Sequence, residues 1–559
     1  MMKKLISLAL AGALMLALAA CGGDEPGNIN DVSPAPSAPA SQQPSDAPSS
    51  GGAQELIFVL SNEPDGIDPG VTNNSFAKYV LNNCFEGLVT YDESGSVVPG
   101  NAESWDISDD GTVYTFHLRS GLKWSDGSPL TAQDYVYAYQ RVLTPATAAQ
   151  YMSMFTDYIV NAKEFYEGSA TADELGIKAL DDTTLEITLM KPTAYFVDLA
   201  SMWCFDPVQK ATIDANGERW TASADSYICN GPFKMTAINM GEGYVLEKNE
   251  HYWNADSVTL EKLTFRIITD NATALTAYES GEVDGITAIP AADYSRLKAS
   301  DPGFNSFPSY STTYYNINCS KAPYDDPLVR KALALAIDRQ AIIDSVLQGR
   351  GVPAYSYLSP GYVVDGKDIT DGRSDNELTA GANVEAARAA LAEAGYPNGE
   401  GFPTLQLSYY SSDTVKMIAE AMAEMLQNNL GIKVDISSND WAVFYDSVQA
   451  GNYEVAAMGW SADYQHPMSF LPLFKTGDSS NNSFYSNSEY DALVEQVMVE
   501  SDPAKAAELI MQAEAIAAGD YCCLPLYYGT NTFLMKDYVS GYYMTSSSNL
   551  YFQNVKVNK

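Results

Sequence analysis

The sequence predicts an α/β fold, because strand-like and helix-like patterns alternate along it. The clearest case lies in the C-terminal half. There, residues 404–410 have the composition of a strand, residues 413–429 repeat apolar side chains at helical spacing, and residues 432–436 are again strand-like. A strand, a helix and a second strand in this order favour parallel pairing of the two strands. At 559 residues the chain is long enough for two or three folding units.

The N-terminal half also contains both kinds of element. Residues 55–60 (Glu-Leu-Ile-Phe-Val-Leu) form a strand candidate that ends before a segment rich in Pro, Gly and Asp. Residues 114–118 alternate as a half-buried strand does. Thr131 and Asp134 have the spacing of a capping box, which predicts a helix from this point to Val142.

A further helix is predicted near the middle of the chain. Asp325 and Asp326 would lie at the positive end of its dipole, with Pro327 at an early helical position. Apolar residues follow at helical spacing, and Gly349 offers an end.

The charge balance restricts the possible partners. The sequence has 71 acidic and 32 basic residues, a formal net charge of −39. Such a surface repels phosphate backbones and anionic lipid headgroups. We therefore expect no nucleic-acid partner and no direct binding to a membrane surface.

The N-terminus has the features of a secretion signal. Two lysines precede an apolar run from Leu5 to Ala20, which is shorter than the roughly 20 residues that a membrane-spanning helix needs. The run ends in Leu-Ala-Ala-Cys, the cleavage box of bacterial lipoproteins, so we predict a signal peptide over residues 1–20 and lipid attachment at Cys21. An ordinary cleaved signal with a coincidental cysteine is the alternative. Residues 21–53, rich in Pro, Ser, Ala and Gly, are predicted to form a disordered tether.

The sequence lacks the motifs that carry catalysis or metal binding in common enzyme classes. It contains no GxSxG, HExxH, GxxxxGK[ST] or GxGxxG pattern, and its three histidines are well separated. The later cysteines show no zinc-ligand spacing, so each is expected to be a buried free thiol or part of a disulfide. Hydrolysis by two carboxylic acids stays open on composition alone, but no pair stands out. We therefore expect no enzyme activity, no metal site and no cofactor.

Four groups of motifs follow one another along the chain. They are FHLRSGLKWSDGSPLTAQD at 116–134, NGPF at 230–233 with EKNEHYW at 247–253, GEVD at 281–284, and NIN at 316–318 with APYDDPLVRKAL at 322–333. In order and spacing they resemble the extracytoplasmic solute-binding proteins of ABC importers for peptides and nickel, and their oligopeptide-binding branch in particular. The resemblance covers about residues 55–559.

This resemblance implies a two-lobed fold of the periplasmic-binding-protein (Venus-flytrap) type with an extra insert domain. Lobe I would combine residues 54–95, 224–308 and 525–559. The insert domain would cover residues 96–223, and lobe II residues 309–524. The ligand would be buried between the lobes, which close about a hinge.

The resemblance also implies a peptide site. Residues 459–464 (Gly-Trp-Ser-Ala-Asp-Tyr) match a family motif whose aspartate receives the peptide α-ammonium, which gives this role to Asp463. A cation taken from water into a closed cleft needs such a carboxylate, although Asp463 could instead cap a turn. Two segments are expected to contact the peptide main chain, and three aromatic residues to line the cleft, with a core position as the alternative for each aromatic. These residues are Gly459, Trp460, Ser461, Asn73, Asn74, Ser75, Tyr151, Trp441 and Tyr314.

Departures from the family pattern leave the other end of the ligand without an assigned residue. Oligopeptide-binding relatives commonly place basic residues for the peptide carboxylate where this chain has Val415, Val448 and Ala457. A cysteine pair of the family falls on Ser311 and Ser461, so its disulfide is missing. We therefore expect weak discrimination between free and amidated peptide C-termini.

These features together predict a monomeric receptor that passes short peptides to the transmembrane subunits of an ABC permease. It would be anchored outside the cytoplasmic membrane by the lipid on Cys21 alone. Two alternatives are a receptor for another solute (nickel, an oligosaccharide or a heme-like ligand) and a peptide-sensing module without import. Asp463 argues against nickel, whereas the missing carboxylate anchors favour a non-peptide solute.

Overall fold

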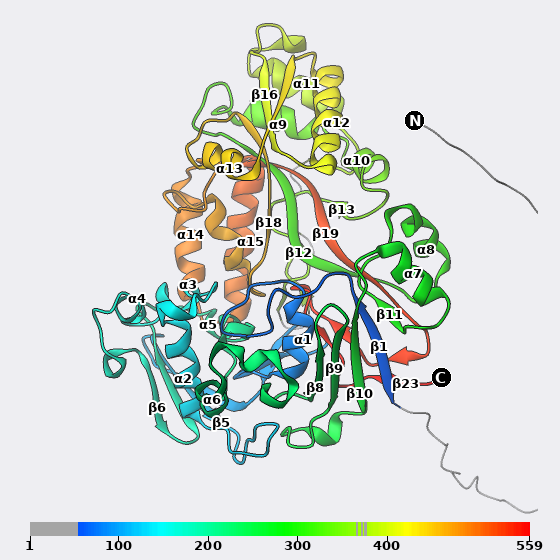
Figure 1. Cartoon of the computed structure of the whole chain (residues 1–559). Helices are drawn as coiled ribbons and strands as arrows, with labels where there is room; N and C mark the ends of the chain where they lie inside the picture. The colour runs from blue at the N-terminus through cyan, green and yellow to red at the C-terminus, as the bar shows by residue number, and fades with distance from the viewer. Residues whose placement is uncertain (1–53, 365–366, 371–372, 374–376) are drawn as a thin grey trace, which may run out of the picture. The chain divides into compact units, whose positions relative to one another are not determined.

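A computed structural model describes residues 54–364, 367–370, 373 and 377–559 (Figure 1). The predicted signal peptide, the lipidation site Cys21 and the tether lie outside these residues. All described residues belong to one unit, Gly51–Lys559. Helices and strands alternate along it, so the predicted α/β class is confirmed.

One large mixed sheet runs through most of this unit. Its strands, in order, are β17 (Val434–Asn439), β16 (Leu405–Tyr410), β18 (Val455–Ser461), β12 (Phe304–Ile317), β19 (Cys523–Met535), β11 (Gly285–Ile286), β1 (Glu55–Leu60), β10 (Lys262–Ile267), β9 (Gly243–Lys248) and β8 (Phe233–Asn239), with β13 (Val352–Pro353) beside β19. The two long strands β12 and β19 are antiparallel, with Phe304 opposite Leu534 and Asn316 opposite Cys523. They join the strands of the N-terminal half to those of the C-terminal half (Figure 1).

The N-terminal part of the sheet is built on β1, whose bounds match the predicted strand. It pairs in parallel with β10 and with β11. Leu56, Phe58, Val59 and Leu60 are fully buried. This is why the strand is recognisable as an apolar run, because a strand covered on both faces has no polar side to show. Helix α1 (Ala77–Cys84) follows and packs into the same core.

A separate four-stranded antiparallel sheet lies between residues 102 and 188. Its order is β4 (Ala102–Ile107), β5 (Val113–Leu118), β7 (Thr184–Thr188) and β6 (Ile177–Asp181). The predicted alternation is confirmed in β5, where every second side chain is buried. Helix α2 (Ala132–Val142) is also confirmed. Its capping box forms, with the Thr131 amide donating to Asp134 Oδ2 at 2.8 Å.

The predicted βαβ unit near residue 410 is confirmed. Strands β16 and β17 are parallel, with Leu405 opposite Val434, and helix α12 (Asp413–Leu430) connects them. The helix ends at Gly431, whose φ of 74° is left-handed and therefore favours glycine. The second strand starts two residues later than predicted and continues to Asn439.

The prediction of one helix in the middle of the chain is wrong in its length. Two shorter helices lie there. Helix α9 (Pro327–Leu335) starts as expected, with the Leu328 amide donating to Asp326 Oδ1 at 2.8 Å. Asp338 then caps a new helix, α10 (Arg339–Ser345). The break is held by the buried Arg339 guanidinium, which donates to the carbonyls of Ala334 and Ile337 and so satisfies groups that a continuing helix would have used.

The remaining elements complete the two halves. The other α-helices are α3 (Ser153–Thr156), α4 (Ala162–Tyr166), α5 (Phe196–Leu199), α6 (Lys210–Asn216), α7 (Asn271–Glu279), α8 (Tyr294–Ser300), α11 (Val384–Glu393), α13 (Trp441–Gln449), α14 (Ser488–Val499) and α15 (Pro503–Gly519). Two-stranded sheets pair β2 (Val89–Tyr91) with β3 (Val97–Pro99), β14 (Val363–Val364) with β15 (Lys367–Asp368), β20 (Val539–Ser540) with β23 (Lys556–Val557), and β21 (Tyr543–Met544) with β22 (Leu550–Tyr551). No helix in the described part of the chain is long and apolar enough to cross a membrane.

In the part of the chain that the structure describes, the cysteines form no disulfide and no metal site is present. Cys84, Cys204, Cys229, Cys319, Cys522 and Cys523 are free thiols, and all but the half-buried Cys319 are buried. The sequence left open whether each cysteine is a buried free thiol or part of a disulfide, and these six are free thiols. Among the same residues no group of His, Cys, Asp and Glu is arranged to hold a metal ion.

Candidate ligand-binding site

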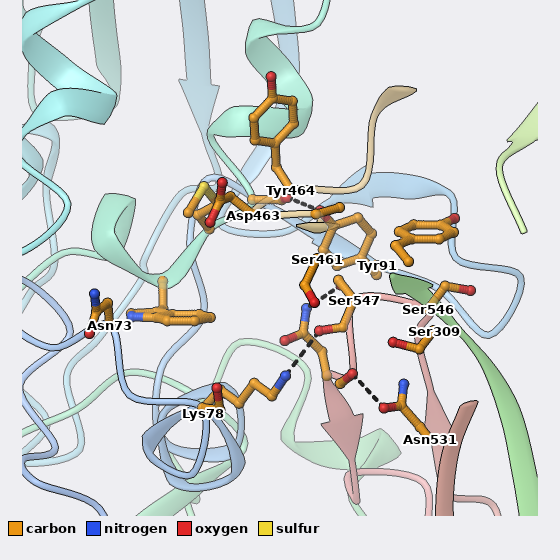
Figure 2. A pocket seen from close by; sticks show the side chains of 18 of the residues that line it. Asn73, Lys78, Tyr91, Ser309, Ser461, Asp463, Tyr464, Asn531, Ser546 and Ser547 are labelled. Atoms are coloured by element: carbon orange, nitrogen blue, oxygen red, sulfur yellow. Dashed lines mark hydrogen bonds between the residues drawn. The ribbon is translucent and has the colours of Figure 1, made fainter. Parts of the chain in front are cut away.

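A cavity of about 420 Å³ brings together segments that are far apart in the sequence, and we name it the charged cavity (Figure 2). Its walls come from many parts of the chain. They include the segment 73–79 around α1, residues 201–203, Ser309 and Tyr310 in β12, residues 461–464 at the end of β18, and residues 546–549. The lining residues are Asn73, Ser75, Phe76, Lys78, Tyr79, Tyr91, Tyr151, Ser201, Met202, Trp203, Ser309, Tyr310, Ser461, Ala462, Asp463, Tyr464, Asn531, Ser546, Ser547, Ser548 and Asn549. Among them, Asp463 and Lys78 are the charged ones.

Asp463 lies in this cavity just beyond the end of β18. Its amide donates to Ser469 Oγ at 3.1 Å, which fixes the backbone. Its carboxylate, by contrast, has no hydrogen bond or ion pair with any described residue. Asp463 is exposed to the cavity, but the walls around it remove part of the water from its carboxylate, and this partial desolvation raises its pKa above the ordinary aspartate value. A carboxylate held in this way favours a cationic group.

Strand β18 presents a free edge beside Asp463. On one side it pairs with β12 along its whole length, from Val455 to Ser461. On the other side it pairs with β16 only at Val455 and Ala456. Residues 457–461 therefore have no partner strand on that side within the described chain. Such an edge is a template for an added strand.

On its paired side, β18 approaches β12 closely at Gly459. A Cβ at Gly459 would lie 3.0 Å from the Thr312 carbonyl oxygen, so a larger residue would press on the neighbouring strand. Ser311 and Ser461, the positions of the missing family disulfide, are opposite each other in the β12–β18 pair.

The three predicted residues before α1 divide into two groups. Asn73 and Ser75 are exposed and line the charged cavity. Asn74 does not line it. Its side-chain oxygen accepts from the amides of Phe76 and Ala77 at 2.8 and 3.3 Å and so holds the start of α1. The structure thus gives Asn74 a local structural role.

A second cavity, of about 280 Å³, adjoins the first at Ser461, and we name it the aromatic cavity. It is lined by Ser311, Thr312, Thr313, Tyr315, Tyr410, Thr414, Val415, Ile418, Trp441, Ala457, Met458, Gly459, Trp460, Ser461 and Tyr527. None of these described residues is charged. Two of the three positions where relatives carry basic residues, Val415 and Ala457, line it, whereas Val448 is fully buried.

The aromatic predictions have different outcomes. Trp441 is 52% exposed and lines the aromatic cavity, with its ring stacked on Tyr445 at 5.3 Å. Tyr151 lines the charged cavity, where burial and the nearby Asp463 raise its pKa. Tyr314 lines neither cavity. It is 3% exposed and packs against Phe474, because its position in β12 turns the side chain into the core.

Several lining residues were not identified from the sequence, and Lys78 is the most important. It lies in the first turn of α1, and its ammonium donates to the Ser547 carbonyl oxygen at 3.0 Å. Burial lowers its pKa to about 8. Ser546, Ser547 and Ser548 also line the cavity, and a serine run of this kind carries no recognisable signal in a sequence.

A cavity with a carboxylate that has no partner among the described residues, beside a free strand edge, suits the binding of a small solute. Comparison with known proteins agrees. The sequence model of the bacterial extracellular solute-binding proteins, family 5 (middle region), matches residues 96–482. The periplasmic oligopeptide-binding protein OppA of Salmonella typhimurium is 34% identical over 100% of this chain and 99% of its own length. The chain therefore belongs to this family of solute-binding proteins.

Solved structures agree with this assignment. The unliganded open form of the periplasmic murein tripeptide-binding protein MppA matches with a TM-score of 0.81 and 33% identity, covering 90% of this chain and 97% of that one. Haemophilus influenzae OppA in complex with the peptide RPPGFSPFR matches with a TM-score of 0.65 and 31% identity, covering 91% and 99%. The two-lobed α/β fold predicted from the motifs is confirmed. Members of the family are binding proteins.

Proposed function

We propose that the protein binds short peptides outside the cytoplasmic membrane and delivers them to the transmembrane subunits of an ABC importer. The observation that carries this proposal is the Asp463 carboxylate, which opens into the charged cavity next to the free edge of β18. A peptide offers the matching groups, an α-ammonium followed by an extended backbone. Relatives named as oligopeptide-binding and murein-tripeptide-binding proteins support the same ligand class.

In this proposal the peptide adds to β18 as an extra strand. Each main-chain hydrogen bond would contribute about 0.5–1.5 kcal/mol, and the charge-assisted contact at Asp463 about 1.5–3 kcal/mol. Backbone contacts do not depend on side chains, so the receptor would accept many sequences. No bond in the peptide is broken, so the protein needs no catalytic residue and no cofactor for this role.

The lobes would provide the closing movement. Lobe I (residues 54–95, 224–308 and 525–559), with the insert domain (96–223), would be joined to lobe II (309–524) by two chain crossings, which fall within β12 and β19. Few crossings allow a hinge, because only a few backbone angles must change for the lobes to close on a ligand.

The anchor belongs to the same proposal. Lipid attachment at Cys21, after removal of residues 1–20, would hold a monomeric receptor to the outer face of the cytoplasmic membrane through a flexible tether. Replacement of Cys21 with Ser should release the protein or leave it unprocessed, without changing the ligand affinity of the folded part. Recovery of Cys21→Ser in a lipidated, membrane-bound form would contradict the anchor.

The solutes that co-purify with the protein test the function directly. The protein is purified with no ligand added and then denatured, and the small molecules that it releases are identified by mass spectrometry. Calorimetry then measures the binding of the compounds found. We expect intact short peptides. Recovery of only non-peptide solutes, together with no heat of binding for peptides, would contradict the proposal. Peptide uptake by cells with and without the gene separates import from sensing alone.

A further inference from the structure

Lys78 places a cation in the same cavity as the Asp463 carboxylate. Figure 2 shows the two side chains on different sides of the space, with Lys78 directed toward Ser547. Lys78 comes from α1 and Asp463 from the segment after β18. These two residues are the charged groups among the described residues that line this cavity.

The position of Lys78 is unfavourable for a purely structural lysine. It lies in the first turn of α1, where the positive end of the helix dipole repels an ammonium group. It is half-buried, and the loss of water lowers its pKa to about 8. Surface lysines avoid both costs by extending into solvent.

Nothing in the described protein neutralises this cation. Lys78 forms no ion pair with a carboxylate, although the chain has 71 acidic residues. The contact that the structure gives its ammonium is the Ser547 carbonyl oxygen, so the other N–H groups remain available to a ligand in the cavity. Asp463, the acid of the same cavity, is likewise unpaired.

We infer that Lys78 binds a carboxylate of the ligand inside the charged cavity, close to the α-ammonium that Asp463 holds. This inference rests on the proposed peptide-binding function and narrows its ligand class. The favoured peptides carry a carboxylate near their N-terminus. For dipeptides the inference departs from the expectation, drawn from Val415, Val448 and Ala457, of weak discrimination between free and amidated C-termini; for longer peptides that expectation stands.

Two kinds of peptide offer a carboxylate at this place. One is a dipeptide, whose C-terminal carboxylate stays near its N-terminus. The other is a longer peptide with an acidic side chain among its first residues. A longer peptide that follows β18 would pass into the aromatic cavity, whose described lining has no charged side chain. The C-terminal carboxylate of such a peptide would lie beyond the reach of Lys78.

Matched acid and neutral probes separate these sources. Calorimetry compares Ala-Ala with Ala-Ala amide, and the amidated tetrapeptide Ala-Glu-Ala-Ala with its Gln counterpart. The proteins are the wild type, Lys78→Met, Lys78→Arg and, as a control, Lys433→Met, because Lys433 is exposed and lines neither cavity.

We expect the wild type to prefer at least one acid over its neutral partner by about tenfold or more. Lys78→Met should remove this preference, while Lys78→Arg and Lys433→Met keep it. The pair that shows the preference identifies the source of the carboxylate. The melting temperature of ligand-free Lys78→Met should equal or exceed that of the wild type, because a poorly solvated cation is removed.

Two results would overturn the inference while leaving the proposed function intact. One is a wild type that binds the neutral peptides but prefers no acid. The other is a preference that survives in Lys78→Met. Failure of the wild type to bind any of these peptides would instead overturn the proposed function, and the inference with it.

Discussion

The charged cavity and the aromatic cavity adjoin at Ser461 but differ in the chemistry of the residues that line them. The first contains a carboxylate and an ammonium group, neither with an ion-pair partner among the described residues, surrounded by tyrosine, serine and asparagine side chains. The second contains Trp441, Trp460 and Tyr410 and, in its described lining, no charge. Strand β18 runs from one to the other and presents its free edge beside both.

This difference indicates how one site can combine a fixed register with broad specificity. Charged contacts depend strongly on distance and direction, so the charged cavity would fix where the ligand begins. Aromatic contacts depend mainly on the area that is buried, so the aromatic cavity would accept side chains of many shapes. The experiments below test this division, beginning with the largest expected effect.

Removal of the carboxylate should have the largest effect. We expect Asp463→Ala to weaken binding of free-amine peptides by about 1.5–3 kcal/mol, roughly tenfold to more than a hundredfold. N-acetylated peptides lack the cation and should lose much less. Asp256→Ala is the matched control, because Asp256 is exposed and lines neither cavity. Calorimetry that finds equal losses for acetylated and free-amine peptides would remove Asp463 from the ammonium role.

The free edge of β18 predicts an alternating pattern along the ligand. A pentapeptide is N-methylated at one backbone amide at a time, and each form is titrated. Amides that face β18 should lose about 1–3 kcal/mol, because an acceptor is left unpaired, and the intervening amides should lose less. The same alternation should persist in Asp463→Ala, whose strand edge is unchanged. Losses of equal size at every position would contradict strand addition.

The fold could be predicted where a local pattern decides the structure. The strand at residues 55–60, helix α2 with its capping box, and the βαβ unit around α12 all follow from neighbouring residues. The break between α9 and α10 could not be predicted in this way. It depends on Arg339, which also donates to the carbonyl of Pro525 on β19, a contact across 186 positions of the sequence.

The site shows the same limit. Asp463 and the edge residues 459–461 were assigned through a continuous motif, and Trp441 through its place in the family. Lys78 has no such signal, because its partner Ser547 is 469 positions away. Tyr314 illustrates another limit. The resemblance implied a place near the cleft, with a core position as the alternative, and the choice between them depends on packing against Phe474, which neighbouring residues do not reveal.

The aromatic cavity should respond to side chains rather than to charge. We expect Trp441→Ala to weaken binding of peptides that carry a Phe or Trp beyond their second residue by about 0.5–1.5 kcal/mol. Dipeptides, which stay in the charged cavity, should bind unchanged. Met240→Ala is the control, because Met240 is an exposed apolar residue that lines neither cavity. A loss of dipeptide binding in Trp441→Ala would contradict the division between the cavities.

The smallest expected effect concerns the ligand-free protein. Burial raises the pKa of Asp463, so its folded-state pKa lies above that of the unfolded chain. When both states are ionised, at neutral pH, the folded state carries the cost of a poorly solvated charge. Below the unfolded pKa both states are protonated and that cost is absent. Asp463 therefore favours folding less at neutral pH than in acid.

Asp463→Asn removes the titration while keeping the shape of the side chain. We expect the ligand-free variant to melt at or above the wild-type temperature at pH 7. The difference should shrink as the pH falls through the raised pKa of Asp463 and vanish below about pH 4, the ordinary aspartate range. Tyr151, Tyr158, Tyr464 and Cys204 interact with the Asp463 charge, but burial raises the pKa of each, so none titrates in this window. A variant that is less stable than the wild type at pH 7 would mean that a partner within the protein satisfies Asp463. The carboxylate would then no longer be reserved for a ligand, and the contrast between the two cavities would lose its basis.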